Sequence, residues 1–178
     1  MTGQPNQNRK LLDKRALMCW HEAGHVWQCW KTKVRIDRVS LRGVLHAPFP
    51  DPGNELRQAM AGSAAIAIHR NWPFEMAFLF GGAIGSDANG GDPRDALEAA
   101  FKFMRPGAKK LVLYDDEIEA VYTLMRRAYQ EVFKDMGQAQ AWSEVTAIAN
   151  ALLKALPDDT AQLSGDDLAR AIGKTAQF

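Results

Sequence analysis

Trp20-His21-Glu22-Ala23-Gly24-His25-Val26 is the stretch of sequence that decides how this chain folds and which chemistry it carries. Residues four positions apart lie on the same face of an α-helix, so His21 and His25 can both reach a single metal ion. Glu22 follows His21 by about 100° around the helix axis, which places its carboxylate beside such an ion rather than on it. The spacing therefore predicts a zinc site with Glu22 as general base.

The residues around this motif predict a helix over about residues 10–31. No proline occurs between residues 11 and 30, and apolar side chains recur with the helical period. The alternative is a packed core helix whose histidines bond to their neighbours. A core helix has no need of a glutamate between the two histidines, because buried glutamate is rare unless it is paired.

Composition places the 178-residue chain among soluble globular proteins of one domain, with 47% hydrophobic and 24% charged residues. The net charge of +1 argues against a nucleic-acid partner held by bulk electrostatics. No apolar run approaches the ~20 residues of a membrane span, and the polar N-terminus is not typical of a signal peptide. We therefore expect a cytoplasmic protein in which Cys19 and Cys29 are reduced.

The first half of the chain is expected to carry the metal site. Residues 34–41 read as a strand that Gly43 ends, and a proline-rich loop with His46 follows. If this strand lies at a sheet edge, it could hold an extended peptide. Residues 55–70 predict a helix rich in small side chains, which suits a helix packed closely behind the metal site. A glycine-rich loop then leads to a helix that begins with Asp92 as N-cap and Pro93 at its first position.

The second half is predicted to be helical, over residues 112–136 and 139–155, with a final turn that Ser164 caps. The expected fold class is mainly α (α+β), with a small β-sheet beside the motif helix and a C-terminal helical bundle. Residues 1–9 are expected to form a disordered tail. Residues 10–178 are expected to form a single domain, with a metal-site half over 10–107 and a helical half over 108–178.

A catalytic zinc ion needs a third protein ligand and one open position. Asp95 is our choice, because it lies in the first turn of a helix that the glycine-rich loop can bring to the metal. Asp92 ranks lower, since capping the helix already accounts for it. The alternative interpretation of Asp95 is a first-turn aspartate favoured by the helix dipole. The minor candidates are Asp87, Glu98, His46 and His69.

Trp20 to Val26, followed by Val39-Ser-Leu-Arg-Gly43, resembles the peptidase domain of the FtsH family of membrane-bound, ATP-dependent zinc proteases. Met60-Ala-Gly-Ser-Ala-Ala65 is similar to the small-residue helix of that family. Arg94-Asp95-Ala-Leu-Glu-Ala-Ala100 resembles its Asn-Asp-Leu-x-x-Ala-Thr segment, whose aspartate is the third zinc ligand. The resemblance covers about residues 10–174 and implies a zincin-like domain with one Zn²⁺ per chain, held by His21, His25 and Asp95.

The chain also departs from the family. Arg94 and Ala100 replace the usual asparagine and threonine, and neither a transmembrane helix nor an ATPase module is expected. The resemblance therefore implies an ATP-independent metalloprotease, a zinc endopeptidase that hydrolyses flexible or unfolded polypeptides. The alternatives are a catalytically silent zinc-binding regulatory module of the same fold and a zinc hydrolase for other bonds. A homo-oligomer and a separate ATPase or adaptor partner remain open. Trp20, Trp27 and Trp30 are either core residues or, if exposed, a partner site.

Overall fold

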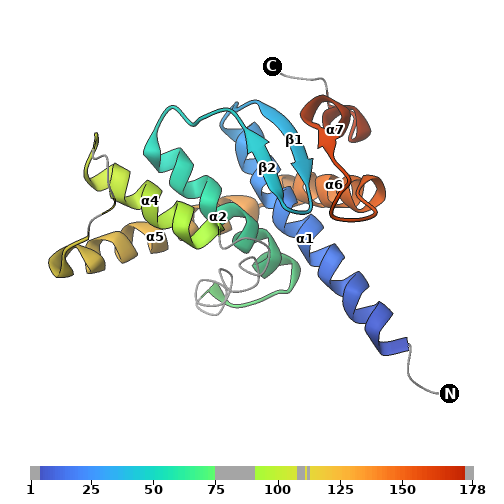
Figure 1. Cartoon of the computed structure of the whole chain (residues 1–178), viewed down its shortest axis with the longest axis horizontal. Helices are drawn as coiled ribbons and strands as arrows, with labels where there is room; N and C mark the ends of the chain where they lie inside the picture. The colour runs from blue at the N-terminus through green and yellow to red at the C-terminus, as the bar shows by residue number, and fades with distance from the viewer. Residues whose placement is uncertain (1–4, 75–90, 108–110, 112, 175–178) are drawn as a thin grey trace.

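The computed structural model describes residues 5–74, 91–107, 111 and 113–174 and is mainly helical, with a small three-stranded antiparallel sheet (Figure 1). This confirms the predicted fold class. In chain order the elements are α1 (Pro5–Lys31), β1 (Ile36–Ser40), β2 (Gly43–His46), α2 (Pro52–His69), α4 (Gly91–Met104), α5 (Asp115–Met136), α6 (Ala139–Ala155), β3 (Leu163–Ser164) and α7 (Gly165–Ala171). None of the helices in this part of the chain is long and apolar enough to cross a lipid bilayer.

The close approach of α1 to α2 sets the centre of the fold. Gly24 of α1 lies against the main chain of α2, where a Cβ atom would stand only 2.3 Å from the carbonyl oxygen of Ala61. Ala23, Ala64 and Ala65 are fully buried along the two helices. Small side chains therefore let the helix axes approach, and this confirms the prediction of a small-residue helix packed closely behind the metal motif.

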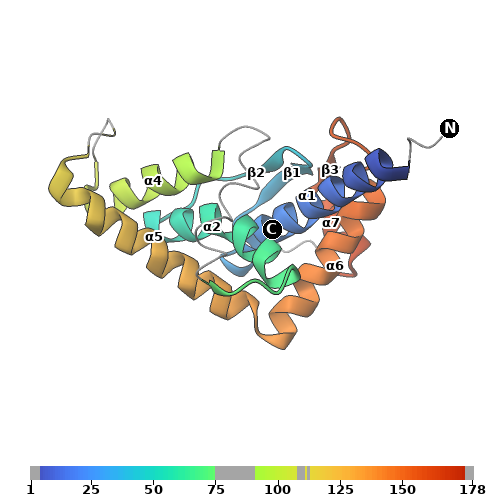
Figure 2. The ribbon, with the colours of Figure 1, turned by 90° about the horizontal axis from the view of Figure 1, so that it is seen from below.

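The two long C-terminal helices, α5 and α6, pack against the pair formed by α1 and α2. Helix α5 packs along α2, and α6 packs along α1, so that α5 and α6 form the two sides of a V in Figure 2. Their inward faces are fully apolar at Val132, Ile148 and Leu152, which expose 1% or less of their surface. Burial of such residues contributes about 1.5–3 kcal/mol each to folding, so this half of the chain holds α1 in place.

The sheet corrects two expectations. Strand β1 is central in the order β2-β1-β3, so the predicted strand does not lie at an edge, and β2 takes that place. Residues 43–46, expected to be a strand end and loop, form β2 instead. Gly43 makes this hairpin possible because its φ of 142° is strained for other residues, and it pairs with Ser40 across a two-residue turn.

Other boundaries match more closely. Helix α6 has the predicted bounds, and the side chain of Ser164 accepts a hydrogen bond from the Asp167 amide as the predicted cap of α7. Helix α1 begins at Pro5, so residues 5–9 belong to a helix rather than to the expected tail. Most of the predicted glycine-rich loop lies outside the described residues.

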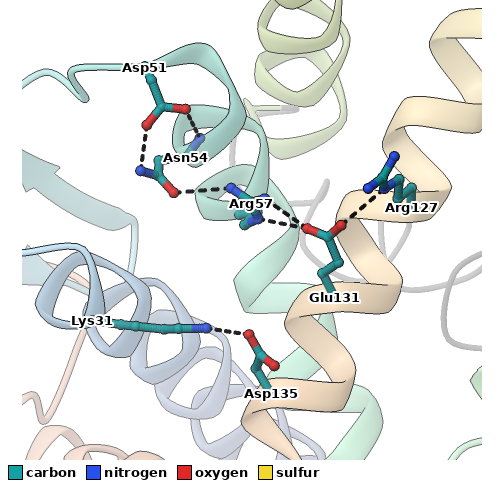
Figure 3. Close-up of polar contacts among 7 residues, drawn as sticks. All are labelled: Lys31, Asp51, Asn54, Arg57, Arg127, Glu131 and Asp135. Carbon is teal, nitrogen blue, oxygen red and sulfur yellow. Dashed lines mark hydrogen bonds and ion pairs between the residues drawn. The ribbon is translucent and has the colours of Figure 1, made fainter.

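Polar side chains tie α5 to the two central helices, as Figure 3 shows. Arg57 of α2 donates two hydrogen bonds to Glu131 of α5, at 2.8 and 3.0 Å. Arg127, which also lies on α5, donates another to Glu131 at 3.1 Å. Lys31 at the end of α1 pairs with Asp135. These contacts lie at the surface, where an ion pair contributes about 0.2–1 kcal/mol, so they orient α5 more than they stabilise it.

Candidate metal centre

His21 and His25 lie side by side on α1, as the sequence predicts, and both are buried. Their Nε2 atoms are 3.1 Å apart. The Oδ2 atom of Asp92, from the first turn of α4, lies 2.7 Å from Nε2 of His21 and 3.3 Å from Nε2 of His25. These three residues form a group that could hold a metal ion.

The third member of the group is Asp92, and this corrects the choice of Asp95. Helix α4 begins at Gly91, so Asp92 lies within its first turn, and its carboxylate contacts the imidazoles. Asp95 lies one turn further along the helix and is exposed. One turn moves a side chain by about 5 Å along the helix axis, so the two aspartates cannot take the same place. The prediction ranked Asp92 below Asp95 because capping the helix already accounted for Asp92, and that ranking was wrong.

The imidazole of His25 is held in a defined orientation. Its Nδ1–H donates to the main-chain oxygen of Gln58 at 2.8 Å. A carbonyl oxygen only accepts hydrogen bonds, so Nδ1 carries a proton. In the protonated ring Nε2–H donates to Asp92 at 3.3 Å, and in the neutral ring the lone pair on Nε2 is available to a metal ion. Helix α2 thereby positions a ring that belongs to α1.

Gly62 of α2 makes room for both rings. A Cβ atom at this position would lie 2.5 to 2.6 Å from atoms of His21 and from Nε2 of His25. Any residue other than glycine at position 62 would therefore place a side-chain atom against the two nitrogens that face Asp92. Gly62 and the role of Gln58 were missed from the sequence, and the run of small residues in 59–65 was the signal that could have directed attention to them.

Glu22 is buried beside this group, with 2% of its surface exposed, and its Oε2 atom has no hydrogen-bond partner among the residues that the structure describes. Burial raises the pKa of its carboxyl group above the ordinary value, although the nearby charges of His21 and His25 oppose the shift. A buried carboxylate with a free oxygen beside two imidazoles is suited to exchange a proton with a ligand in the site.

Charge couples the other members of the group. Burial disfavours the protonated ring of His25, but the charge and hydrogen bond of Asp92 outweigh it and raise the pKa of His25 to about 9. Burial likewise disfavours ionised Asp92, but the His25 charge and both imidazole hydrogen bonds hold the pKa of that carboxyl well below its usual range. A metal ion that binds to His25 must therefore displace a proton from its imidazole.

The donor set fits a small divalent cation. Two ligand atoms at 2.0–2.1 Å from a tetrahedral zinc ion are about 3.3 Å apart. The two separations that involve Nε2 of His25, 3.1 and 3.3 Å, are close to that value, and Oδ2 of Asp92 lies nearer to Nε2 of His21, at 2.7 Å. Two neutral imidazoles and one carboxylate are ordinary zinc ligands. The residues present therefore fit a metal ion without rearrangement of the helices.

The group opens into a cleft of about 340 Å³. Helix α1 forms the floor with His21, Glu22 and His25, while β2 contributes Gly43, Val44 and His46 to one wall. The remaining walls come from α2 and α4. His46, a minor ligand candidate, donates its Nδ1–H to the main-chain oxygen of Ala47 at 2.8 Å and faces the cleft beside Phe49.

The remaining candidates lie elsewhere or further along the cleft. His69 stacks on Trp20, with ring centroids 4.1 Å apart, outside the cleft lining. Glu98 lines the cleft but does not join the metal group, and Asp87 lies outside the described residues. Trp20 and Trp27 are buried in the core, which favours the packing interpretation of these residues over an exposed partner site.

No protein-family model matches the chain, and no curated protein matches it either.

Proposed function

We propose that the protein is a zinc-dependent endopeptidase that hydrolyses peptide bonds in flexible or unfolded polypeptides without using ATP. The observation that carries this proposal is the burial of Glu22 beside the group of His21, His25 and Asp92, with an Oε2 atom that no described residue hydrogen-bonds. Within the described residues three side chains form this group, as in catalytic zinc sites, whereas structural sites are closed by four. The resemblance to the FtsH peptidase domain supports the same reading, with the third ligand moved to Asp92.

Each residue has a defined role in this mechanism. His21, His25 and Asp92 would hold the zinc ion, which when bound supplies Lewis acidity that activates a water molecule and polarises a carbonyl group. Glu22 accepts a proton from the attacking water and delivers it to the leaving amine. Its buried position keeps bulk water away from the carboxylate during both transfers.

Strand β2 is suited to hold the substrate. It pairs with β1 on one side and lies at the edge of the sheet in the described part of the chain, and its residues Gly43 and Val44 line the cleft. An extended peptide could add to this edge through main-chain hydrogen bonds. Such binding requires an unfolded segment, which is why flexible polypeptides are the proposed substrates.

Cleavage of fluorescently labelled casein by zinc-loaded protein tests the proposal, with Glu22→Gln assayed in parallel and zinc content measured on both. The glutamine side chain keeps the size of Glu22 but cannot accept the proton, so we expect activity to fall by at least about a hundredfold while zinc is retained. Chelation should abolish cleavage by the wild type. Cleavage that survives chelation, or equal rates in the two proteins, would contradict the proposal.

A further inference from the structure

The cleft carries negative charge that the proposed hydrolysis does not use. Asp95 and Glu98 of α4 and Glu55 of α2 line it together with Glu22, and we refer to Asp95, Glu98 and Glu55 as the acidic wall. Among the described lining residues Arg42 is the sole lysine or arginine, and its guanidinium group pairs with Asp159. The free charge that faces a ligand is therefore mostly negative.

The acidic wall leads away from the metal group along α4. Asp92, Asp95 and Glu98 follow one another at intervals of three residues, which is a step of about 4.5 Å along the helix axis. Residues of an extended peptide are spaced by about 3.3 Å. A peptide that runs from the metal group along α4 would therefore place the side chains of its next few residues near Asp95 and Glu98.

The two flanking carboxylates are only partly neutralised. Glu98 pairs with Arg94 at 2.9 Å and Glu55 pairs with Lys102 at 2.8 Å, and both pairs are exposed to solvent. Asp95 makes no ion pair within the described part of the chain. Burial and the charges of Asp92 and Glu98 raise the pKa of Asp95, which agrees with a concentration of negative charge at this point.

A second observation shows that the ligand should donate hydrogen bonds. Gln58 lines the same cleft with 7% of its surface exposed, and within the described part of the chain its buried Oε1 atom has no hydrogen-bond partner. Buried acceptors of this kind are normally paired. An ammonium or guanidinium group carries donors only and a positive charge, so it matches both the free oxygen of Gln58 and the acidic wall.

We propose that the acidic wall selects polypeptides that carry a lysine or arginine side chain within a few residues of the bond that is cleaved. The inference rests on the proposed function and adds a substrate preference to it. Asp95 and Glu98 are the specificity-determining residues, and Gln58 supplies a neutral acceptor in the same cleft.

Peptide binding tests the preference separately from hydrolysis. Fluorescence anisotropy would be measured on the zinc-loaded Glu22→Gln protein with short labelled peptides, acetylated and amidated at their ends. The peptides differ at one central position, which is Lys, norleucine or Glu. Norleucine keeps the methylene stem of Lys without its charge. We expect Lys to bind about tenfold tighter than norleucine, and Glu to bind most weakly.

The double variant Asp95→Asn/Glu98→Gln should bring the Lys and norleucine affinities close together. Asp116→Asn/Glu119→Gln is the matched control, because it changes the same residue types at the same spacing on the exposed face of α5, outside the cleft lining. The control should keep the preference for Lys. A preference that also shrinks with added salt would support an electrostatic origin.

The inference would be overturned by equal affinities for the Lys and norleucine peptides, by a preference that Asp95→Asn/Glu98→Gln leaves unchanged, or by no measurable binding of the Lys peptide. A norleucine peptide with a free N-terminus that binds as tightly as the Lys peptide would also overturn it, in favour of recognition of an α-amine. Because hydrolysis is measured separately with casein, a Lys preference without cleavage would contradict only the proposed function.

Discussion

At the scale of the residue, the metal group depends on a position in α2 that carries no side chain. Gly62 has no side chain, and the space that a Cβ atom would fill is taken by the imidazoles of His21 and His25. Glycine in a helix interior otherwise costs about 1 kcal/mol relative to alanine. A glycine in the middle of α2 is therefore explained by the rings that pack against it.

Replacing Gly62 by alanine should weaken zinc binding. The helix itself favours alanine, but the added methyl group lies 2.5 to 2.6 Å from ring atoms that must approach the metal. Overpacking of this kind costs about 1–3 kcal/mol, so we expect zinc affinity measured by competition with a chelating dye to fall by about tenfold or more. Gly137→Ala is the control, because the nearest contact of its added atom is the main-chain oxygen of Phe133 at 3.1 Å and neither imidazole is among its contacts. Equal affinities in the two variants would contradict this role.

The two thiols should be inert in the folded protein. Both cysteines are free and buried. Burial raises the pKa of Cys19 to about 11, although the charge of Arg15 opposes the shift, and burial raises the pKa of Cys29 to about 12. The thiolate is the reactive form, so at pH 8 we expect no reaction with a thiol reagent until denaturant is added, when both should react. Rapid modification of the native protein at pH 8 would show that these sites are open to solvent.

At the scale of the element, long helices with regular apolar spacing could be predicted, and α6 is an example because its bounds match residues 139–155. Strand β2 could not, since four residues that include a glycine and a histidine carry little periodic signal. The prediction of Asp95 as the third member of the metal group failed for a related reason. Asp92 and Asp95 occupy neighbouring turns of α4, and the packing of α4 on α2 decides which of them reaches the imidazoles.

The contact between α2 and α5 offers a test at this scale. Burial slightly opposes ionisation of Glu131, but hydrogen bonds from Arg57 and Arg127 outweigh it and lower the pKa of Glu131. A lowered pKa adds stability above the unfolded-state value near 4.5, and this stability is lost as the pH falls. Glu131 is partly exposed, so we expect Glu131→Gln to cost about 0.5 kcal/mol in urea unfolding at pH 7 and less at pH 3. An equal cost at both pH values would mean that the ion pairs contribute nothing.

At the scale of the whole molecule, the metal group joins parts of the chain that are far apart in sequence. Two of its members come from α1 and the third from α4, while Gly62 of α2 lies against the two imidazoles and Gln58 of α2 orients His25. The motif in α1 was readable from spacing alone, because four-residue periodicity is a local property of a helix. The packing of three helices is not local, so the sequence left the third ligand, the supporting residues and the cleft wall open.

The measurement that tests the central claim most directly is zinc content and affinity for wild type, Asp92→Asn and Asp95→Asn, prepared in the same way. Each asparagine keeps the size of the side chain and removes its charge. We predict one zinc ion per chain in the wild type and in Asp95→Asn, and affinity at least about a hundredfold weaker in Asp92→Asn, since a direct ligand is lost. Loss of zinc from Asp95→Asn together with full retention by Asp92→Asn would contradict the metal centre described for this fold.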